Sequence, residues 1–123
     1  GKWQSIDFQK EGVSNIEYEA KFFRAAIKWL QGMPMAETPS QKGLLLFTDD
    51  VMNSRKNKAS YFLSDKQKKA YIDLVDSFCT HWIERDKSEK QNSPYSLPVI
   101  DTLYPEAALE IINAGSEQCG AEL

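Results

Sequence analysis

Hydrophobic side chains recur at helical spacing through residues 14–31. They form two neighbouring rows, with Ile16, Ala20, Phe23, Ile27 and Leu30 in one and Tyr18, Phe22, Ala25 and Trp29 in the other. This pattern predicts a helix that is apolar over more than half of its circumference, and such a helix lies at the centre of a fold or meets two partners. Ser14 and Glu17 have the spacing of a capping box at its start, and Gly32 fits the C-cap.

Two further capping signals precede apolar patterns of helical period. Thr38 and Pro39 suit the N-cap and the first position of a second helix. Its apolar face is expected to contain Leu44, Phe47, Val51 and Met52. The apolar run at 44–47 also fits a buried strand, but the capping signal favours a helix. Ser64 and Gln67 form a capping box for a third helix, which is expected to end near Asp86. Its inner face is expected to contain Ala70, Tyr71, Leu74, Val75, Phe78, Trp82 and Ile83.

The last quarter of the chain predicts one shorter helix over about residues 103–113, with Pro105 in its first turn and Gly115 at its C-cap. Residues 87–98 form the longest segment without any periodicity. The four helices together predict an all-α fold, an irregular four-helix bundle or an orthogonal helical array, in which residues 1–123 form a single helical domain. A short extended N-terminal segment is compatible with the mixed pattern of residues 1–13.

Charge is unevenly distributed along the chain. Its 123 residues are 41% hydrophobic and 27% charged, which is typical of a globular domain, and no apolar run is long enough to span a membrane. The net charge of -3 argues against a dedicated nucleic-acid-binding protein. Residues 55–69 nevertheless contain six basic side chains and one acid, whereas residues 91–123 contain five acids and no base.

The residues that catalysis needs do not form a recognisable set. Asp73, Ser77 and His81 lie four residues apart on one helix side, but Ser77 occupies the middle position, where a catalytic triad has its histidine. Asp73 would also lie about 12 Å from His81 along the helix axis. His81 is the only histidine and has only Glu84 nearby as a second metal ligand, so no metal site and no cofactor are expected. We therefore expect a protein that is not an enzyme, with a carboxylate-dependent hydrolase as a remote alternative.

The two cysteines, Cys79 and Cys119, leave the compartment open. As a disulfide they would close a loop of about 40 residues and stabilise the fold by about 4 kcal/mol. That outcome fits a periplasmic or secreted protein, whereas two free thiols fit a cytoplasmic one.

Surface features provide the candidate binding residues. Tyr95, Ser96 and Leu97 belong to the loop bounded by Pro94 and Pro98, and a stiffened loop that carries a tyrosine suits a protein contact. Arg55, Lys56 and Lys58 are candidates for electrostatic steering of a partner.

The expected function is therefore non-enzymatic binding of another protein. A small acidic helical chain without catalytic groups resembles bacterial toxin-immunity and inhibitor proteins, which implies a toxin or an enzyme as the partner and steric blockage as the mechanism. The wide apolar face of the first helix also suggests a homodimer. The main alternative is a nucleic-acid-associated regulatory module that uses the basic segment 55–69. This segment includes Tyr61 and Phe62 among its Lys and Arg side chains, a combination that suits binding of single-stranded nucleic acid.

Overall fold

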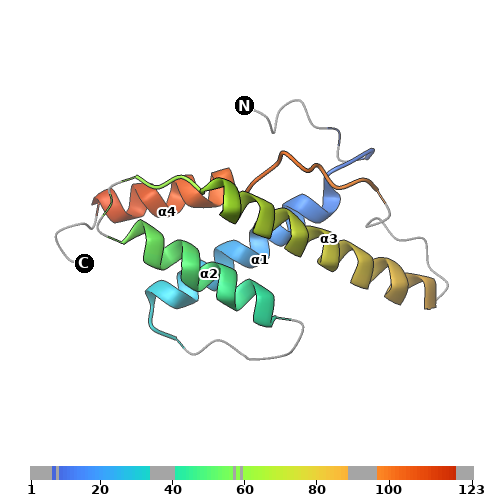
Figure 1. Ribbon diagram of the computed structural model, residues 1–123, viewed down its shortest axis with the longest axis horizontal. Coiled ribbons are helices and arrows are strands. Elements are labelled where there is room, and N and C mark those ends of the chain that lie inside the picture. Colours follow the sequence, from blue (N-terminus) through green and yellow to red (C-terminus); the bar gives the residue numbers. More distant parts are fainter. Residues whose placement is uncertain are drawn as a thin grey trace.

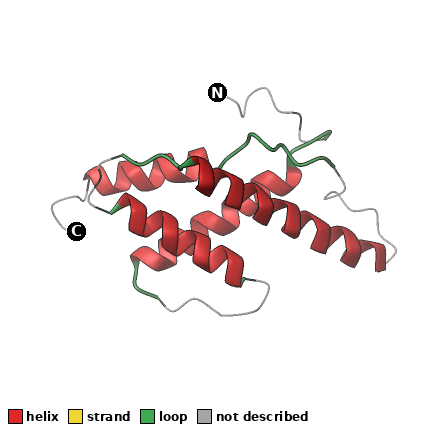
Figure 2. Cartoon of the chain, in the orientation of Figure 1, coloured by secondary structure: helices red, strands yellow, loops and turns green. Residues whose placement is uncertain are grey.

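Four α-helices make up most of the computed structural model, which describes residues 7, 9–33, 41–56, 58, 60–88 and 97–118 (Figure 1). They are α1 (Val13–Leu30), α2 (Lys42–Arg55), α3 (Asp65–Ser88) and α4 (Glu106–Gln118). Figure 2 shows helices and loops but no strand in this described part of the chain. The all-α prediction is therefore confirmed, and the helical assignment of the apolar run at 44–47 is correct. The predicted extended N-terminal segment lies mostly outside the described residues.

Helix α1 contacts each of the other three helices. In Figure 1, α2 and α3 run side by side in opposite directions, and α1 crosses behind them. Helix α4 packs on α1, and Arg55 at the end of α2 reaches it with one hydrogen bond to Ile112. The three neighbours bury Tyr18, Phe22 and Ala25 of one predicted row. In the other row, Ile16, Ala20 and Leu30 are exposed and Phe23 and Ile27 are half-buried, so the homodimer stays a prediction.

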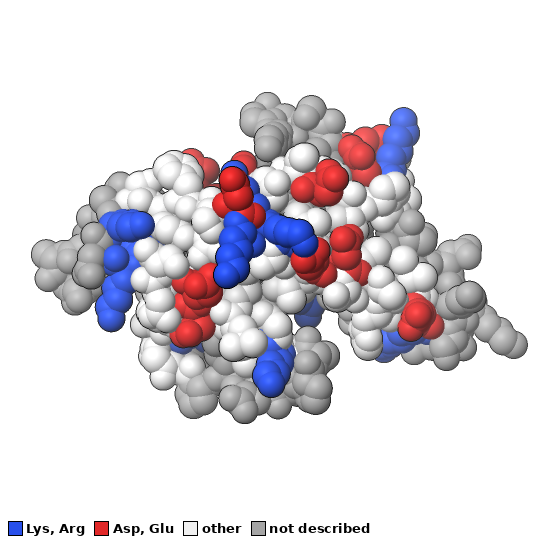
Figure 3. Space-filling view, in the orientation of Figure 1, with Lys and Arg blue, Asp and Glu red and all other residues white. Residues whose placement is uncertain are grey.

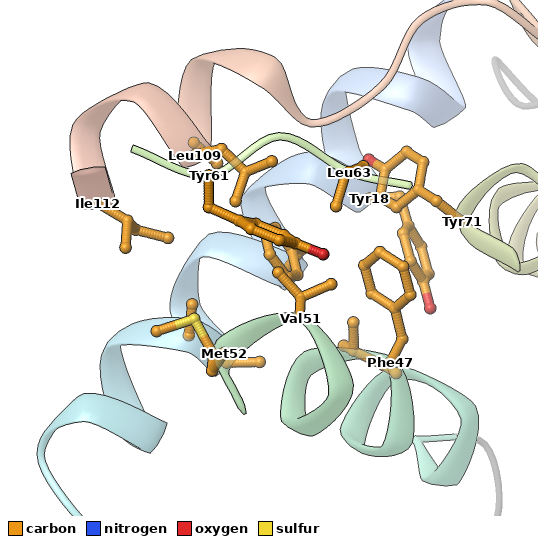
Figure 4. Packing of buried hydrophobic residues seen from close by; sticks show 14 of the residues in the cluster. Tyr18, Phe47, Val51, Met52, Tyr61, Leu63, Tyr71, Leu109 and Ile112 are labelled. Carbon is orange, nitrogen blue, oxygen red and sulfur yellow. The ribbon is translucent and has the colours of Figure 1, made fainter. Parts of the chain in front are cut away.

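Aromatic side chains from α1, α2 and α3 form the middle of the core (Figure 4). The Phe47 ring lies 5.5 Å from the Phe22 ring and 5.6 Å from the Tyr71 ring, centroid to centroid. All four side chains predicted for the apolar face of α2 are buried. The face predicted for α3 is correct at Tyr71 and Val75 but wrong at Ala70, which is exposed. Ala70 is exposed because it points about 100° away from Tyr71 on the helix. The buried side of α3 begins instead at Gln67, which lies four residues before Tyr71.

Two helix ends form as the sequence predicts. The backbone N–H of Gln67 donates to Ser64 Oγ at 3.2 Å, and the backbone N–H of Ser64 donates to Gln67 Oε1 at 3.1 Å, which is a complete capping box. At the end of α1, Gly32 has φ of 67°, and Met33 donates its backbone N–H to the carbonyl of Lys28 at 3.0 Å. These are the features of a Schellman motif, in which glycine adopts the left-handed conformation without strain.

Three other predicted ends are wrong or untested. α1 begins at Val13 with Gly12 as its N-cap, so Ser14 belongs to the first turn and makes no capping box with Glu17. The N–H of Gly12 donates instead to the carbonyl of Pro98 at 3.0 Å. Gly115 lies inside α4 rather than at its C-cap. The predicted caps of α2, Thr38 and Pro39, lie outside the described residues, and the described helix begins at Lys42.

Helix α4 also begins three residues later than the pattern predicts, at Glu106. Leu103 is 2% exposed in the segment that precedes the helix, and its backbone N–H donates to the carbonyl of Ile100 at 3.2 Å. Leu103 is therefore buried although it belongs to a turn, and its apolar character alone wrongly placed it in the helix.

The serines of the two predicted capping boxes should respond oppositely to alanine. Ser14 is 1% exposed, and its Oγ has no hydrogen-bond partner among the described residues, so Ser14→Ala should stabilise the protein by about 1 kcal/mol. Ser64→Ala removes a cap and should destabilise by about 1 kcal/mol. Urea denaturation measures both changes. A loss of stability in Ser14→Ala would contradict the position of Ser14 described above.

Candidate protein-binding surface

Residues 61–63 alternate between the core and the solvent. Tyr61 and Leu63 are each 8% exposed, whereas Phe62 between them is 82% exposed. This segment links α2 to α3 without helical structure, and in an extended chain successive side chains point to opposite sides. Because Tyr61 and Leu63 both face the core, the ring of Phe62 is directed into solvent.

Gln67 holds the start of this segment against α2. Its side-chain oxygen accepts from the Tyr61 hydroxyl, and its side-chain nitrogen donates to Asp50 Oδ2 at 2.9 Å and to Ser54 Oγ at 3.3 Å. One buried side chain on α3 therefore joins the linker to two residues of α2. The capping box at Ser64 fixes the linker immediately after Leu63.

Helix α4 holds the same segment from its other side. The side-chain amide of Asn113 donates to the backbone carbonyl of Tyr61 at 3.1 Å. Lys58 places its ammonium 5.2 Å from the centre of the Tyr61 ring, which is a cation–π distance. Phe62 is thus exposed on a linker that is hydrogen-bonded to α3 and α4 and, through Gln67, connected to α2, so its backbone loses little conformational freedom when a partner binds.

Phe62 lies on the rim of two hollows. One, of about 690 Å³, is lined by Lys58 and Lys66 together with Asp50. The other, of about 610 Å³, lies against α4 and is lined by Lys68 together with Glu106 and Glu110. We call Phe62 with its basic neighbours Lys58 and Lys66 the Phe62 surface. On the face drawn in Figure 3, basic and acidic side chains are interspersed, so no broad patch of one sign covers that view.

The predicted steering residues occupy different environments. Lys56 and Lys58 are exposed, but Arg55 is only 6% exposed. The guanidinium of Arg55 donates to the carbonyl of Ile112 at 3.4 Å, and burial lowers its pKa from the usual value. Arg55 therefore connects the end of α2 to α4, and its charge is not presented at the surface.

The predicted loop contact remains a prediction. Tyr95 and Ser96 lie outside the described residues, and Leu97 is half-buried. Cys79 is buried in α3, but Cys119 lies outside the described residues, so the choice between a disulfide and two free thiols is not tested either.

Comparisons with known proteins add nothing to these assignments. The chain matches no family model, no curated protein and no solved structure. Within the described ranges, no helix has the length and apolar character needed to cross a membrane, and no three side chains are grouped as a metal site would require.

Asp73, Ser77 and His81 do not converge on one site. All three are exposed on α3. The carboxylate of Asp73 lies 3.6 Å from the ammonium of Lys69, and His81 meets the edge of the Trp82 ring at 5.7 Å between centroids. These contacts are local to one helix, as expected from residues on a solvent-facing side.

Phe62 is not among the protein-contact residues that the sequence suggests. The basic segment offered Tyr61 and Phe62 together for stacking, whereas only Phe62 is exposed. A possible signal was the capping box that begins at Ser64, because it ends the linker and leaves residues 61–63 extended. Whether Phe62 or its neighbours Tyr61 and Leu63 point to solvent still depends on which side of this segment packs against α4.

Proposed function

We propose that this chain is a non-enzymatic domain that binds another protein through the Phe62 surface and inhibits it by steric blockage, as toxin-neutralising immunity proteins do. The observation that supports the proposal is the 82% exposure of Phe62 on a linker fixed by α2, α3 and α4. A large aromatic side chain beside hollows is the usual form of a binding hot spot. The energy gained by burying it in a partner is not offset by ordering a loose loop.

The charges around Phe62 are mixed, because Asp50 lies with Lys58 and Lys66 in one hollow and Lys68 lies with Glu106 and Glu110 in the other. Lys58 and Lys66 are exposed beside the ring, and such rim charges chiefly accelerate association. A nucleic acid fits less well. Tyr61 is buried, so the described part of the segment offers one exposed ring and no row of rings on which bases could stack. Glu106 and Glu110 line the neighbouring hollow and would repel a polyanion.

The deciding experiment compares two exposed hydrophobic side chains. Phe62→Ser should weaken binding of the partner by about 30-fold or more, which corresponds to about 2 kcal/mol and a hot spot. Leu46→Ser is the matched control, because Leu46 is 64% exposed on α2 outside the Phe62 surface. The unaltered chain is immobilised and used to capture the partner from a lysate of the cells that produce this chain, and the partner is then purified. Calorimetry then measures its affinity for the three forms.

Unchanged affinity in Phe62→Ser would exclude the Phe62 surface as the contact. The nucleic-acid alternative is tested in parallel with single-stranded DNA at 50 mM salt. Binding that requires Lys58 and Lys66 and falls steeply with salt would replace the protein-binding proposal.

A further inference from the structure

A groove of about 460 Å³ lies between α1, the start of α2 and the second half of α3. In Figure 1 this half of α3 extends beyond α2, and α1 crosses behind both. The groove shares no lining residue with either of the two hollows beside Phe62. It is therefore a separate feature of the molecule.

Basic side chains line one wall of the groove. Lys21, Arg24 and Lys28 follow one another along α1 at intervals of three and four residues and so lie on one helix side. Of the described residues that line the groove, none is acidic. Arg24 and Lys28 are exposed and make no ion pair with the described residues. This concentration of positive charge is notable in a chain whose net charge is -3.

Aromatic and aliphatic side chains form the opposite wall. Phe78 on α3 lies 5.5 Å from Tyr18 and 6.2 Å from Trp82, measured between ring centroids. The ammonium of Lys21 lies 5.6 Å from the centre of the Phe78 ring, where the basic and apolar walls meet. Leu45 and Leu74 extend the apolar lining towards α2.

We propose that this groove binds a small amphipathic anion, that is, a carboxylate, sulfonate or phosphate carried on an aromatic or aliphatic body. The anionic group lies between Arg24 and Lys28, where it receives charge-assisted hydrogen bonds. The body packs against Phe78 and Trp82. The volume of the groove is within the range of small-molecule sites, and a few polar groups on an apolar lining are their usual composition.

Two fluorescent probes that differ in one charge test the assignment. Anilinonaphthalene sulfonate has the anion and the aromatic body, and N-phenylnaphthylamine has the body alone. The double variant Arg24→Gln and Lys28→Gln should bind the sulfonate at least tenfold more weakly and bind the neutral probe within twofold of the unaltered chain. The control, Lys10→Gln with Lys69→Gln, removes the same charge at exposed positions outside the groove and outside the Phe62 surface, and should change neither affinity.

A blocking variant and a mapping measurement complete the test. Ser77 is exposed on the groove wall, so Ser77→Trp should prevent binding of both probes while circular dichroism confirms the fold. Amide chemical shifts should change at Leu45, Ser77 and His81 when the sulfonate is added. Equal sulfonate affinity in the two charge variants, or shift changes confined to other residues, would overturn the proposal. Binding to anionic phosphatidylglycerol vesicles without binding of the soluble sulfonate would also overturn it, in favour of a lipid surface.

Discussion

Asn15→Asp is expected to destabilise the protein by about 3–5 kcal/mol at pH 7, since it puts an uncompensated charge in a buried site and leaves backbone groups unpaired. Asn15 on α1 is 1% exposed, and its side-chain amide donates to the carbonyls of Ile100 at 2.9 Å and Leu103 at 3.2 Å. Its oxygen accepts the backbone N–H of Ile100 at 2.8 Å. One side chain thus fixes the segment that leads into α4.

An aspartate cannot donate either bond, and its charge would face two carbonyl oxygens. Urea denaturation at pH 7 and pH 4 measures the effect, and part of the loss should be recovered at pH 4, where a protonated carboxyl can donate one hydrogen bond. Asn53→Asp is the control, because Asn53 is exposed on α2, and its effect should stay within about 0.5 kcal/mol. An Asn15→Asp variant as stable as the unaltered chain at pH 7 would show that Asn15 does not hold this segment.

Glu19→Gln is expected to stabilise the protein above neutral pH and to leave its stability similar at pH 5. Glu19 is 8% exposed, and its Oε2 accepts the backbone N–H of Ala108 in the first turn of α4 at 3.3 Å. Burial raises the pKa of this carboxyl from 4.5 to about 7. The N–H groups of Ala108 and Ala107 lower the pKa by less, and the charge of Glu106 adds to the rise.

The sign of the pH dependence follows from proton binding. Between pH 4.5 and about 7 the folded state keeps the proton on Glu19 and the unfolded state releases it, so the free energy of unfolding falls as the pH rises. Across pH 5 to 8 this loss amounts to about 2–3 kcal/mol. Glutamine has no charge to desolvate and can still accept the bond from Ala108, so the variant should lack this fall.

Denaturation curves at several pH values for the variant and the unaltered chain isolate the contribution of Glu19, because other groups cancel in the difference. Glu110→Gln serves as the control, since Glu110 is exposed on α4 and its removal should leave the pH profile nearly unchanged. If the difference between Glu19→Gln and the unaltered chain is independent of pH, the carboxyl is not buried as described.

Local patterns predicted local structure well in this chain. The apolar period found α1, α2 and α3, because a helix in a small domain must bury one face. The capping box at Ser64 and the glycine at residue 32 were identified correctly because each is completed by residues within one helical turn. The predicted capping box at Ser14 failed because a distant segment, at Pro98, satisfies the N–H of Gly12 and sets the start of α1.

Contacts between distant segments were not predictable in the same way. Asn15 lies 85 residues from Ile100, and Glu19 lies 89 residues from Ala108, so no local pattern relates either pair. The contact of Arg55 with Ile112 also joins distant segments. It buries Arg55, whereas Lys56 and Lys58, which come shortly after it in the sequence, are exposed.

By itself, the sequence determined that the chain is all-α, where most of its helices lie, and which apolar face of α2 is buried. These properties depend on hydrophobic periodicity and on hydrogen bonds within one turn. The tertiary structure alone decided that Phe62 faces solvent while Tyr61 does not, and that three cations of α1 share a groove with the aromatic side chains of α3. Such properties depend on which helix packs against which, and that is set by the balance of packing over the whole chain rather than by any one segment.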